Sequence, residues 1–126
     1  GLTPETFYDP RRIAILPMGF CYPGTGRSGD LPPRPECALA WRDSLLRTLV
    51  NLRLTVVIGR FAHDYHLAGN GGGVTATVRG WRAWAPENFP LPHPSPRNNA
   101  WLRRHPWFAT ELLPELRRRV THALRD

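Results

Sequence analysis

The sequence predicts an α/β fold in which helices cover both faces of a short parallel sheet, giving a three-layer α/β/α architecture. Two observations favour it: short apolar runs typical of buried strands alternate with segments of helical periodicity, and glycine- and proline-rich loops separate them. A length of 126 residues suits one domain. Ligands of such sheets bind beyond the carboxyl ends of the strands, so we expect the functional residues in the loops there.

Three segments are expected to form strands. Residues 12–16 are nearly all apolar, as in a strand buried on both faces. Residues 52–59 are rich in β-branched side chains and end at Gly59. Residues 88–91 form a last short strand that runs into a proline-rich turn.

Four segments are expected to be helical. Pro35 suits the first turn of the first helix, in which Trp41, Leu45 and Leu49 form an apolar stripe. The last helix repeats an apolar residue at every fourth position, and Pro114 predicts that it either starts near Thr110 or bends at the proline. The four segments are 36–50, 60–67, 75–84 and 108–124.

The charge balance is strongly basic. The chain has 17 basic and 10 acidic residues, a formal charge of +7, and contains arginine but no lysine. A bias toward GC-rich codons explains the choice of arginine better than selection does. The chemistry follows in either case, because the planar guanidinium matches phosphate and stacks on bases. We therefore expect a polyanionic partner.

No segment is expected to span a membrane, because the apolar runs are short. The polar start, interrupted by Pro4 and Pro10, does not match a signal peptide. These features predict a cytoplasmic protein without a membrane partner, whose thiols are reduced.

Three further patterns are weak by themselves. Residues 24–29 match GxGxxG, but the prolines that follow exclude the helix of a dinucleotide site, so a loop is expected. His63 and His66 have helical spacing for zinc, yet surface or half-buried histidines are the better interpretation. Cys21 and Cys37 are either metal-binding thiolates or two small buried side chains, and spacing alone favours the second.

The hexapeptide from His93 to Asn98, His-Pro-Ser-Pro-Arg-Asn, is the most informative motif. Its two prolines stiffen the backbone and direct His93 and Arg97 from a strand end into the expected cleft. That arrangement suits an anionic leaving group beside a phosphate backbone. A proline-rich turn with a solvated histidine explains the composition equally well.

These residues resemble the uracil-DNA glycosylase superfamily. The hexapeptide is similar to its second signature motif, in the form of the single-strand-selective monofunctional type. Cys21-Tyr22-Pro23-Gly24 and Cys37 resemble the iron–sulfur branch, in which a cysteine closes the second strand and another begins a helix sixteen residues later. Residues 52–59 resemble the third strand, and the order along the chain agrees.

The resemblance implies a DNA repair glycosylase that hydrolyses the N-glycosidic bond of a flipped uracil or other deaminated base. His93 would be catalytic, donating a hydrogen bond to the oxygen of the departing base. Ser95, Arg97 and Asn98 would contact the DNA, with Arg97 inserted where the base was. The partner would be DNA containing a damaged base.

The resemblance also implies a base pocket and a cofactor. Many relatives place an asparagine just before the strand-ending cysteine, but this chain has none, so backbone groups of Pro17, Met18 and Gly19 are expected to line the pocket. This leaves the choice of base open. Cys21 and Cys37 would supply two ligands of a [4Fe–4S] cluster, which needs two further cysteines from outside this chain.

Residues 1–126 are expected to be the C-terminal part of a larger domain. The first family motif, which positions water and stacks on uracil, follows a first strand, and nothing before Ile13 matches it. We therefore expect about 60 or more residues upstream. The missing strand is central in the family order two-one-three-four, so the chain alone is expected to be poorly stable and inactive. The complete protein is expected to be a monomer.

Two other hypotheses remain open on the sequence. One is a non-catalytic nucleic-acid-binding relative that holds phosphates with Arg97, Arg103 and Arg104. The other is an unrelated α/β interaction domain in which the hexapeptide is only a turn. The absence of lysine argues against an amine-based lyase step carried out by this segment.

Overall fold

The computed structural model describes residues 1–69 and 71–125. The chain divides into two compact units, Leu2–Leu52 and, together with Gly1, Arg53–Asp126, and each is considered by itself. We call them the N-terminal unit and the C-terminal unit. Within the described residues, no helix combines the length and apolarity that a membrane crossing requires.

The C-terminal unit is built on two parallel strands. Strand β3 (Thr55–Ile58) pairs with β4 (Asn88–Leu91), with Val57 opposite Pro90. Parallel strands need a long crossover, which is supplied here by α4 (Arg60–His66), α5 (Gly73–Arg79) and a 3₁₀ turn (Trp81–Ala83).

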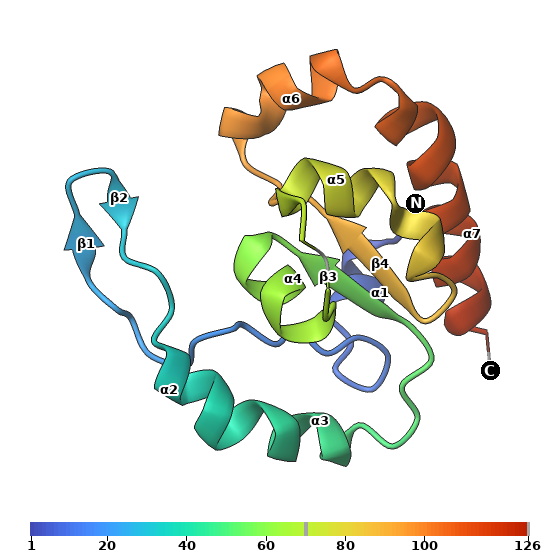
Figure 1. The fold of residues 1–126 in the computed structure, drawn as a ribbon. Coiled ribbons are helices and arrows are strands. Elements are labelled where there is room, and N and C mark those ends of the chain that lie inside the picture. The colour runs from blue at the N-terminus through green and yellow to red at the C-terminus, as the bar shows by residue number, and fades with distance from the viewer. Residues whose placement is uncertain (70, 126) are drawn as a thin grey trace. The chain divides into compact units, whose positions relative to one another are not determined.

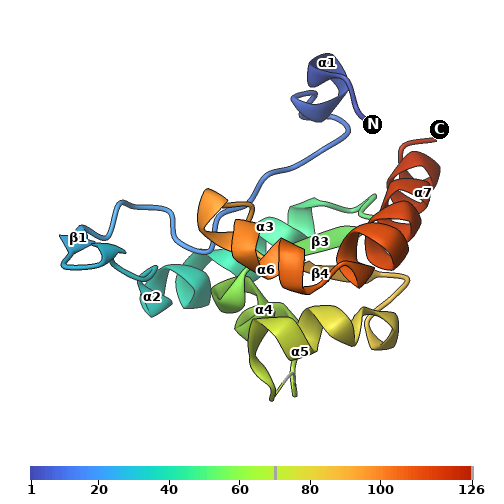
Figure 2. The ribbon, with the colours of Figure 1, turned by 90° about the horizontal axis from the view of Figure 1, so that it is seen from above.

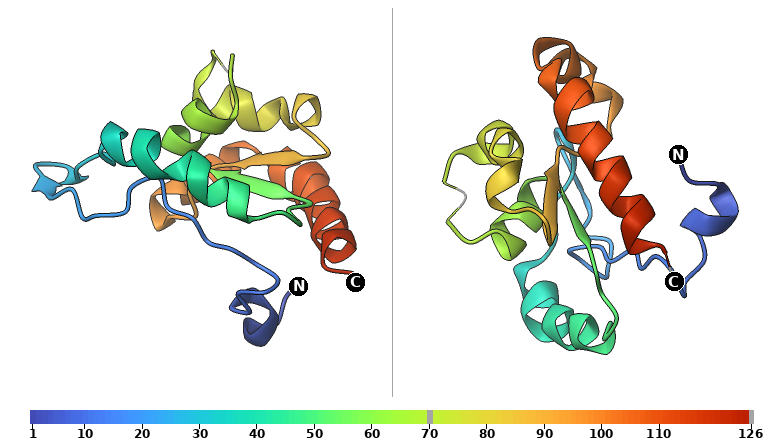
Figure 3. Two further views of the ribbon diagram at one scale, coloured as in Figure 1. Left: turned by 90° about the horizontal axis from the view of Figure 1, so that it is seen from below. Right: turned by 90° about the vertical axis from the view of Figure 1, so that its right-hand side faces the viewer.

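Helices lie on both faces of this sheet. Figure 3 shows α4 and α5 on one side of β3 and β4, and α7 (Leu113–Ala123) on the other. The predicted α/β class with a short parallel sheet is confirmed, and so are the strands expected near 52–59 and at 88–91.

The core of the C-terminal unit lies around β4. Phe89 is fully buried and stacks on Trp81 with 5.5 Å between ring centroids. Val78 of α5 joins this cluster, as do Phe108 and Leu112 from the segment before α7. Burial of such side chains is the main favourable contribution to folding.

The last helix changes type where proline interrupts it. A π-helical turn, Phe108–Leu112, precedes α7, whose first turn contains Pro114. Proline is tolerated there because the first N–H groups of a helix have no partner within it. The α-helix therefore starts at Leu113, and the helical residues before it, from Phe108, differ from the start near Thr110 that the sequence suggested. Helix α6 (Asn99–Arg104) was not predicted by the sequence pattern.

The N-terminal unit contains short elements joined by long irregular segments. The hairpin of β1 and β2 extends beyond α2 in Figures 1 and 2. The GxGxxG segment, residues 24–29, lies in this hairpin. Its elements are α1 (Pro4–Phe7), β1 (Thr25–Gly26), β2 (Gly29–Asp30), α2 (Pro35–Cys37), a π-helical turn (Ala38–Arg42) and α3 (Asp43–Thr48).

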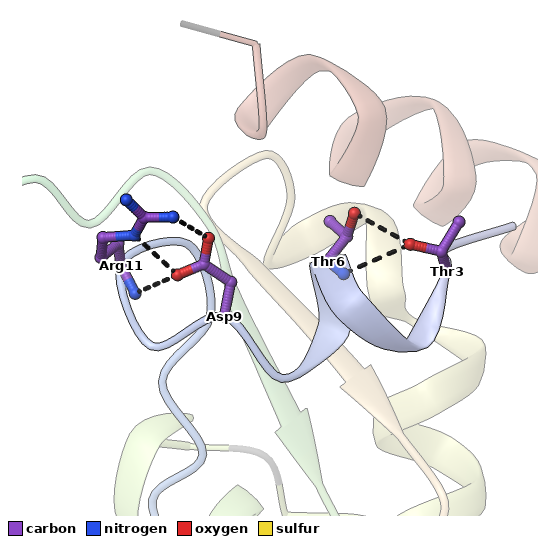
Figure 4. A network of polar contacts seen from close by, with 4 residues as sticks. All are labelled: Thr3, Thr6, Asp9 and Arg11. Atoms are coloured by element: carbon purple, nitrogen blue, oxygen red, sulfur yellow. Dashed lines mark hydrogen bonds and ion pairs between the residues drawn. The ribbon is translucent and has the colours of Figure 1, made fainter.

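Side-chain caps order the first residues of this unit, as Figure 4 shows. Thr3 accepts a hydrogen bond from the Thr6 amide at 3.3 Å and so caps α1. Arg11 donates to both carboxylate oxygens of Asp9, at 3.0 and 2.9 Å. This pairing lowers the pKa of Asp9.

Two expectations for this unit are wrong. Residues 12–16 form no strand: the segment is irregular and Ile15 is 65% exposed. A strand needs a neighbour for its backbone groups, and no described segment pairs with this one. The helix expected at 36–50 is present, but Trp41 is 62% exposed whereas Arg42 is buried. The predicted apolar stripe therefore does not face a core.

Candidate functional site

A rigid turn follows β4 and carries the hexapeptide. The Ser95 amide donates to the His93 carbonyl at 2.8 Å, and the Asn98 amide donates to the Ser95 carbonyl at 2.9 Å. Ser95 also caps the 3₁₀ turn Pro96–Asn98 by accepting from the Arg97 amide at 3.3 Å. Together with Pro94 and Pro96, these bonds fix the backbone that follows His93.

His93 lies at the carboxyl end of the parallel strands, with an exposed side chain. The Gly59 amide donates to the Leu91 carbonyl at 2.9 Å. This bond ties the end of β3 to the end of β4, two residues before His93. Gly59 has a φ of 82°, and a Cβ there would lie 3.8 Å from the Cβ of His93. The backbone angle therefore favours glycine at this position, and the imidazole lies within ordinary contact distance of it.

The other hexapeptide side chains differ in what they contact. Arg97 is exposed, and Ser95 and Asn98 are half-buried. The side-chain nitrogen of Asn98 donates to the His93 carbonyl, so Asn98 braces the turn from within. The turn thus brings together His93, Ser95, Arg97 and Asn98, the four residues that the sequence singled out here.

A second histidine is buried on α4, the helix that follows β3. His63 of α4 is 1% exposed, and its Nε2 donates to the Val57 carbonyl at 3.0 Å. Burial lowers the pKa of His63, and the hydrogen bond to the Val57 carbonyl opposes that shift. Its Nδ1 is buried without a partner among the described residues. The expectation of surface or half-buried histidines is therefore wrong for His63 and confirmed for His66, which is half-buried.

The expected base-pocket loop lies in the N-terminal unit. Pro17 is exposed, and Met18 and Gly19 are half-buried. The buried guanidinium of Arg42 donates to the Pro17 carbonyl at 2.8 Å and to the Leu16 carbonyl at 3.3 Å. The loop is therefore tied to the helix that follows Cys37.

The two cysteines of the N-terminal unit are adjacent. Their Sγ atoms are 3.7 Å apart; Cys21 is exposed and Cys37 is half-buried. The interpretation as two small buried side chains is wrong for Cys21. The hydrogen bond with Cys37 raises the pKa of the Cys21 thiol. Two thiols at this distance have the donor chemistry of a soft-metal or cluster site, but they are half of the four ligands that a cluster needs. No group of three or more candidate ligands forms among the described residues.

Three supporting residues escaped the sequence analysis. Gly59 was identified only as a strand end, His63 only as a weak zinc candidate, and Arg42 not at all. A charged residue within an otherwise apolar helical stretch, as in Ala-Leu-Ala-Trp-Arg, was the available signal for Arg42.

A comparison with family models identifies what this arrangement is similar to. The model of the Uracil DNA glycosylase superfamily matches residues 1–117. The match includes the turn at His93, the loop at Pro17–Gly19 and both cysteines.

Proposed function

Because this chain belongs to the uracil-DNA glycosylase superfamily, we propose that it acts as a monofunctional DNA repair glycosylase on uracil or another deaminated base. Membership supports a glycosylase-type role in DNA repair. The finer proposal depends on the individual residues, and above all on one observation. His93 is exposed at the carboxyl end of β4 on a turn whose backbone is fixed by hydrogen bonds on both sides.

The proposed reaction breaks the bond between the base and the sugar. A base within the stack is out of reach, so the nucleotide must first be flipped. Water then attacks the anomeric carbon of the sugar, and the base leaves with the bonding electrons as an anion. An N–H of the His93 imidazole donates a hydrogen bond to the base oxygen on which this charge develops. A donor of this kind that is fixed in advance typically lowers the barrier by about 2.7–4 kcal/mol.

The rest of the turn is proposed to hold the DNA. The hydroxyl or amide of Ser95 binds a flanking phosphate, and exposed Arg97 enters the space that the flipped nucleotide leaves. The side-chain nitrogen of Asn98 is already used on the His93 carbonyl, which leaves its oxygen for the DNA. Guanidinium groups suit both tasks because they pair with phosphate and stack on bases.

We also propose roles for the loop and the thiols of the N-terminal unit. The backbone of Pro17, Met18 and Gly19 contacts the base, as expected where no asparagine is present. Cys21 and Cys37 are two ligands of a [4Fe–4S] cluster, completed by cysteines outside this chain. A bound cluster would cross-link and order this part of the protein. Iron and sulfide analysis of the anaerobically purified full-length protein tests this proposal, and Cys21→Ser with Cys37→Ser is expected to abolish both signals.

The test of the reaction is base release from a labelled oligonucleotide by the full-length protein. His93→Ala is expected to reduce kcat by about 100- to 1,000-fold, the typical effect of removing one such donor. His122→Ala is the matched control, because His122 is also exposed but lies on α7. Equal activity of His93→Ala and the wild type would contradict the assignment.

A second candidate function is nucleic-acid binding without catalysis. Exposed Arg97, Arg103 and Arg104 form no ion pair within the described part of the chain, so their charge is available to phosphates. Binding that weakens steeply with salt, from a full-length protein that releases no base, would favour this function.

A further inference from the structure

Arg42 has an unusual environment. The structure describes every residue of the N-terminal unit, and Arg42 is its only buried side chain, with 5% of its surface exposed. A buried guanidinium is costly unless its donors find acceptors. Its hydrogen bonds therefore show which part of the unit it holds.

Arg42 lies in an irregular part of its helix. Arg42 ends the π-helical turn Ala38–Arg42, which interrupts the helix between α2 and α3. Such wider turns occur frequently at functional sites. From here the guanidinium reaches the Pro17 and Leu16 carbonyls, at 2.8 and 3.3 Å.

The loop is also held from a second direction. A Cβ on Gly19 would lie 3.1 Å from the Cβ of Pro33 and 3.5 Å from its Cα. These are close contacts with a rigid ring and with backbone. The loop is therefore tied at Pro17 by hydrogen bonds and packed at Gly19 against Pro33.

This arrangement determines which backbone groups remain for a ligand. The carbonyls of Leu16 and Pro17 already accept from Arg42, whereas Met18 and Gly19 form no hydrogen bond with any described residue. Both are half-buried. Half-buried backbone donors and acceptors without partners are suited to reading the polar edge of a base.

We propose that Arg42 is a positioning residue that sets base selectivity by fixing the orientation of the Met18 and Gly19 backbone groups. The inference rests on the proposed glycosylase function. Arg42 acts through the loop and does not itself touch the base.

The experiment compares Arg42→Met and Arg42→Lys with Arg47→Met in the full-length protein. Arg47 is the matched control because it lies on the same helix, is exposed and pairs with Asp43 at 2.6 Å. Oligonucleotides containing uracil, hypoxanthine or xanthine give kcat and KM for each base. The readout is the ratio of kcat/KM between the best and the next-best base.

Arg42→Met is expected to lower kcat for the best base by up to about 100-fold, as a displacement near 1 Å can do. The selectivity ratio is expected to fall about tenfold, within the range for the loss of a specific contact. Arg42→Lys should recover part of the ratio because it keeps one donor, and Arg47→Met should retain the wild-type values. An equal loss on every base, with an unchanged ratio, would overturn the inference because a purely structural role gives that result.

Gly19→Ala provides a second route if Arg42→Met fails to fold. The added methyl presses on Pro33 and displaces the loop while Arg42 stays in place, so the same ratio should fall. A wild-type selectivity in Gly19→Ala would overturn the inference. If the wild-type protein releases no base, the proposed function is overturned and this inference with it. If the wild type is active and Arg42→Met lowers activity equally on every base, the inference alone is overturned.

Discussion

The two units are held together in different ways. The C-terminal unit buries an aromatic and aliphatic cluster around Phe89, whereas the N-terminal unit buries only Arg42 and leaves large apolar side chains such as Leu39 exposed. Its order comes from the cap on α1, the bonds of Arg42 to two carbonyls, prolines and the adjacent thiols. A unit held by polar contacts depends on each of them, whereas an apolar core distributes its stability over many contacts.

The largest expected effect on the free energy of unfolding comes from truncating a side chain of the apolar core. Phe89→Ala removes a fully buried ring and should lower the free energy of unfolding by about 3–5 kcal/mol. Leu39→Ala, at a position that is 83% exposed in the N-terminal unit, should change it by less than about 0.5 kcal/mol. Urea unfolding followed by tryptophan fluorescence measures both. Similar losses in the two variants would remove the contrast between the units.

A smaller effect should come from protonating His63. Because burial lowers its pKa in the folded state, the unfolded chain binds the proton more readily. The stability that neutral His63 provides is complete above the ordinary pKa of 6.5 and declines as the pH falls below it, by at most about 1.4 kcal/mol per pH unit.

His63→Gln removes this titration while its amide still donates to the Val57 carbonyl. Urea unfolding at pH 7.5 and at pH 5.5 should therefore show a smaller difference for this variant than for the wild type. His122→Gln, at an exposed position, should keep the wild-type difference. If His63→Gln kept it as well, another group would be responsible.

The smallest expected effect concerns the ion pairs of α7. Glu115 accepts from Arg118 and Arg119 at 2.6 and 2.7 Å, which lowers its pKa to about 2. Its contribution is complete above the ordinary value of 4.5 and is lost as the pH falls toward 2. Arg118 is exposed, so water screens its pair.

Glu115→Gln should therefore change the unfolding midpoint at neutral pH far less than Phe89→Ala does, and the change should shrink further in high salt. Thermal unfolding at two salt concentrations measures it. A loss comparable to that of Phe89→Ala would show that ion pairs, and not the core, hold α7 in place.

The sequence predicted most of the C-terminal unit because pattern and environment agree there. Residues 55–58 are β-branched and pair with β4 through a buried Val57, and residues 88–91 lead into prolines that end the strand. Helix α6 escaped because it is short and arginine-rich. It is anchored by a contact that no local pattern contains, the hydrogen bond from Trp101 to Thr75 at 2.8 Å.

The N-terminal unit was predicted less well for a physical reason. An apolar run such as residues 12–16 suits a strand, but a strand also needs a neighbour, and local sequence does not specify one. The hexapeptide turn was predicted from its prolines. The bond from the Asn98 side chain to the His93 carbonyl was not predicted, although the two residues are close in the sequence. The approach of Gly59 to His93 and the bonds of Arg42 were not predicted either, because both join residues that only the fold brings together.

Pro90 of β4 has a consequence for the behaviour of the protein at high concentration. The Glu87 and Leu91 carbonyls accept from β3, so the alternate position, Pro90, faces away from that strand. Proline has no N–H to offer there, and neither does Pro92 just beyond the strand. An incoming chain therefore finds no continuous row of donors along this margin. The rings that stiffen the approach to His93 also discourage sheet-like self-association.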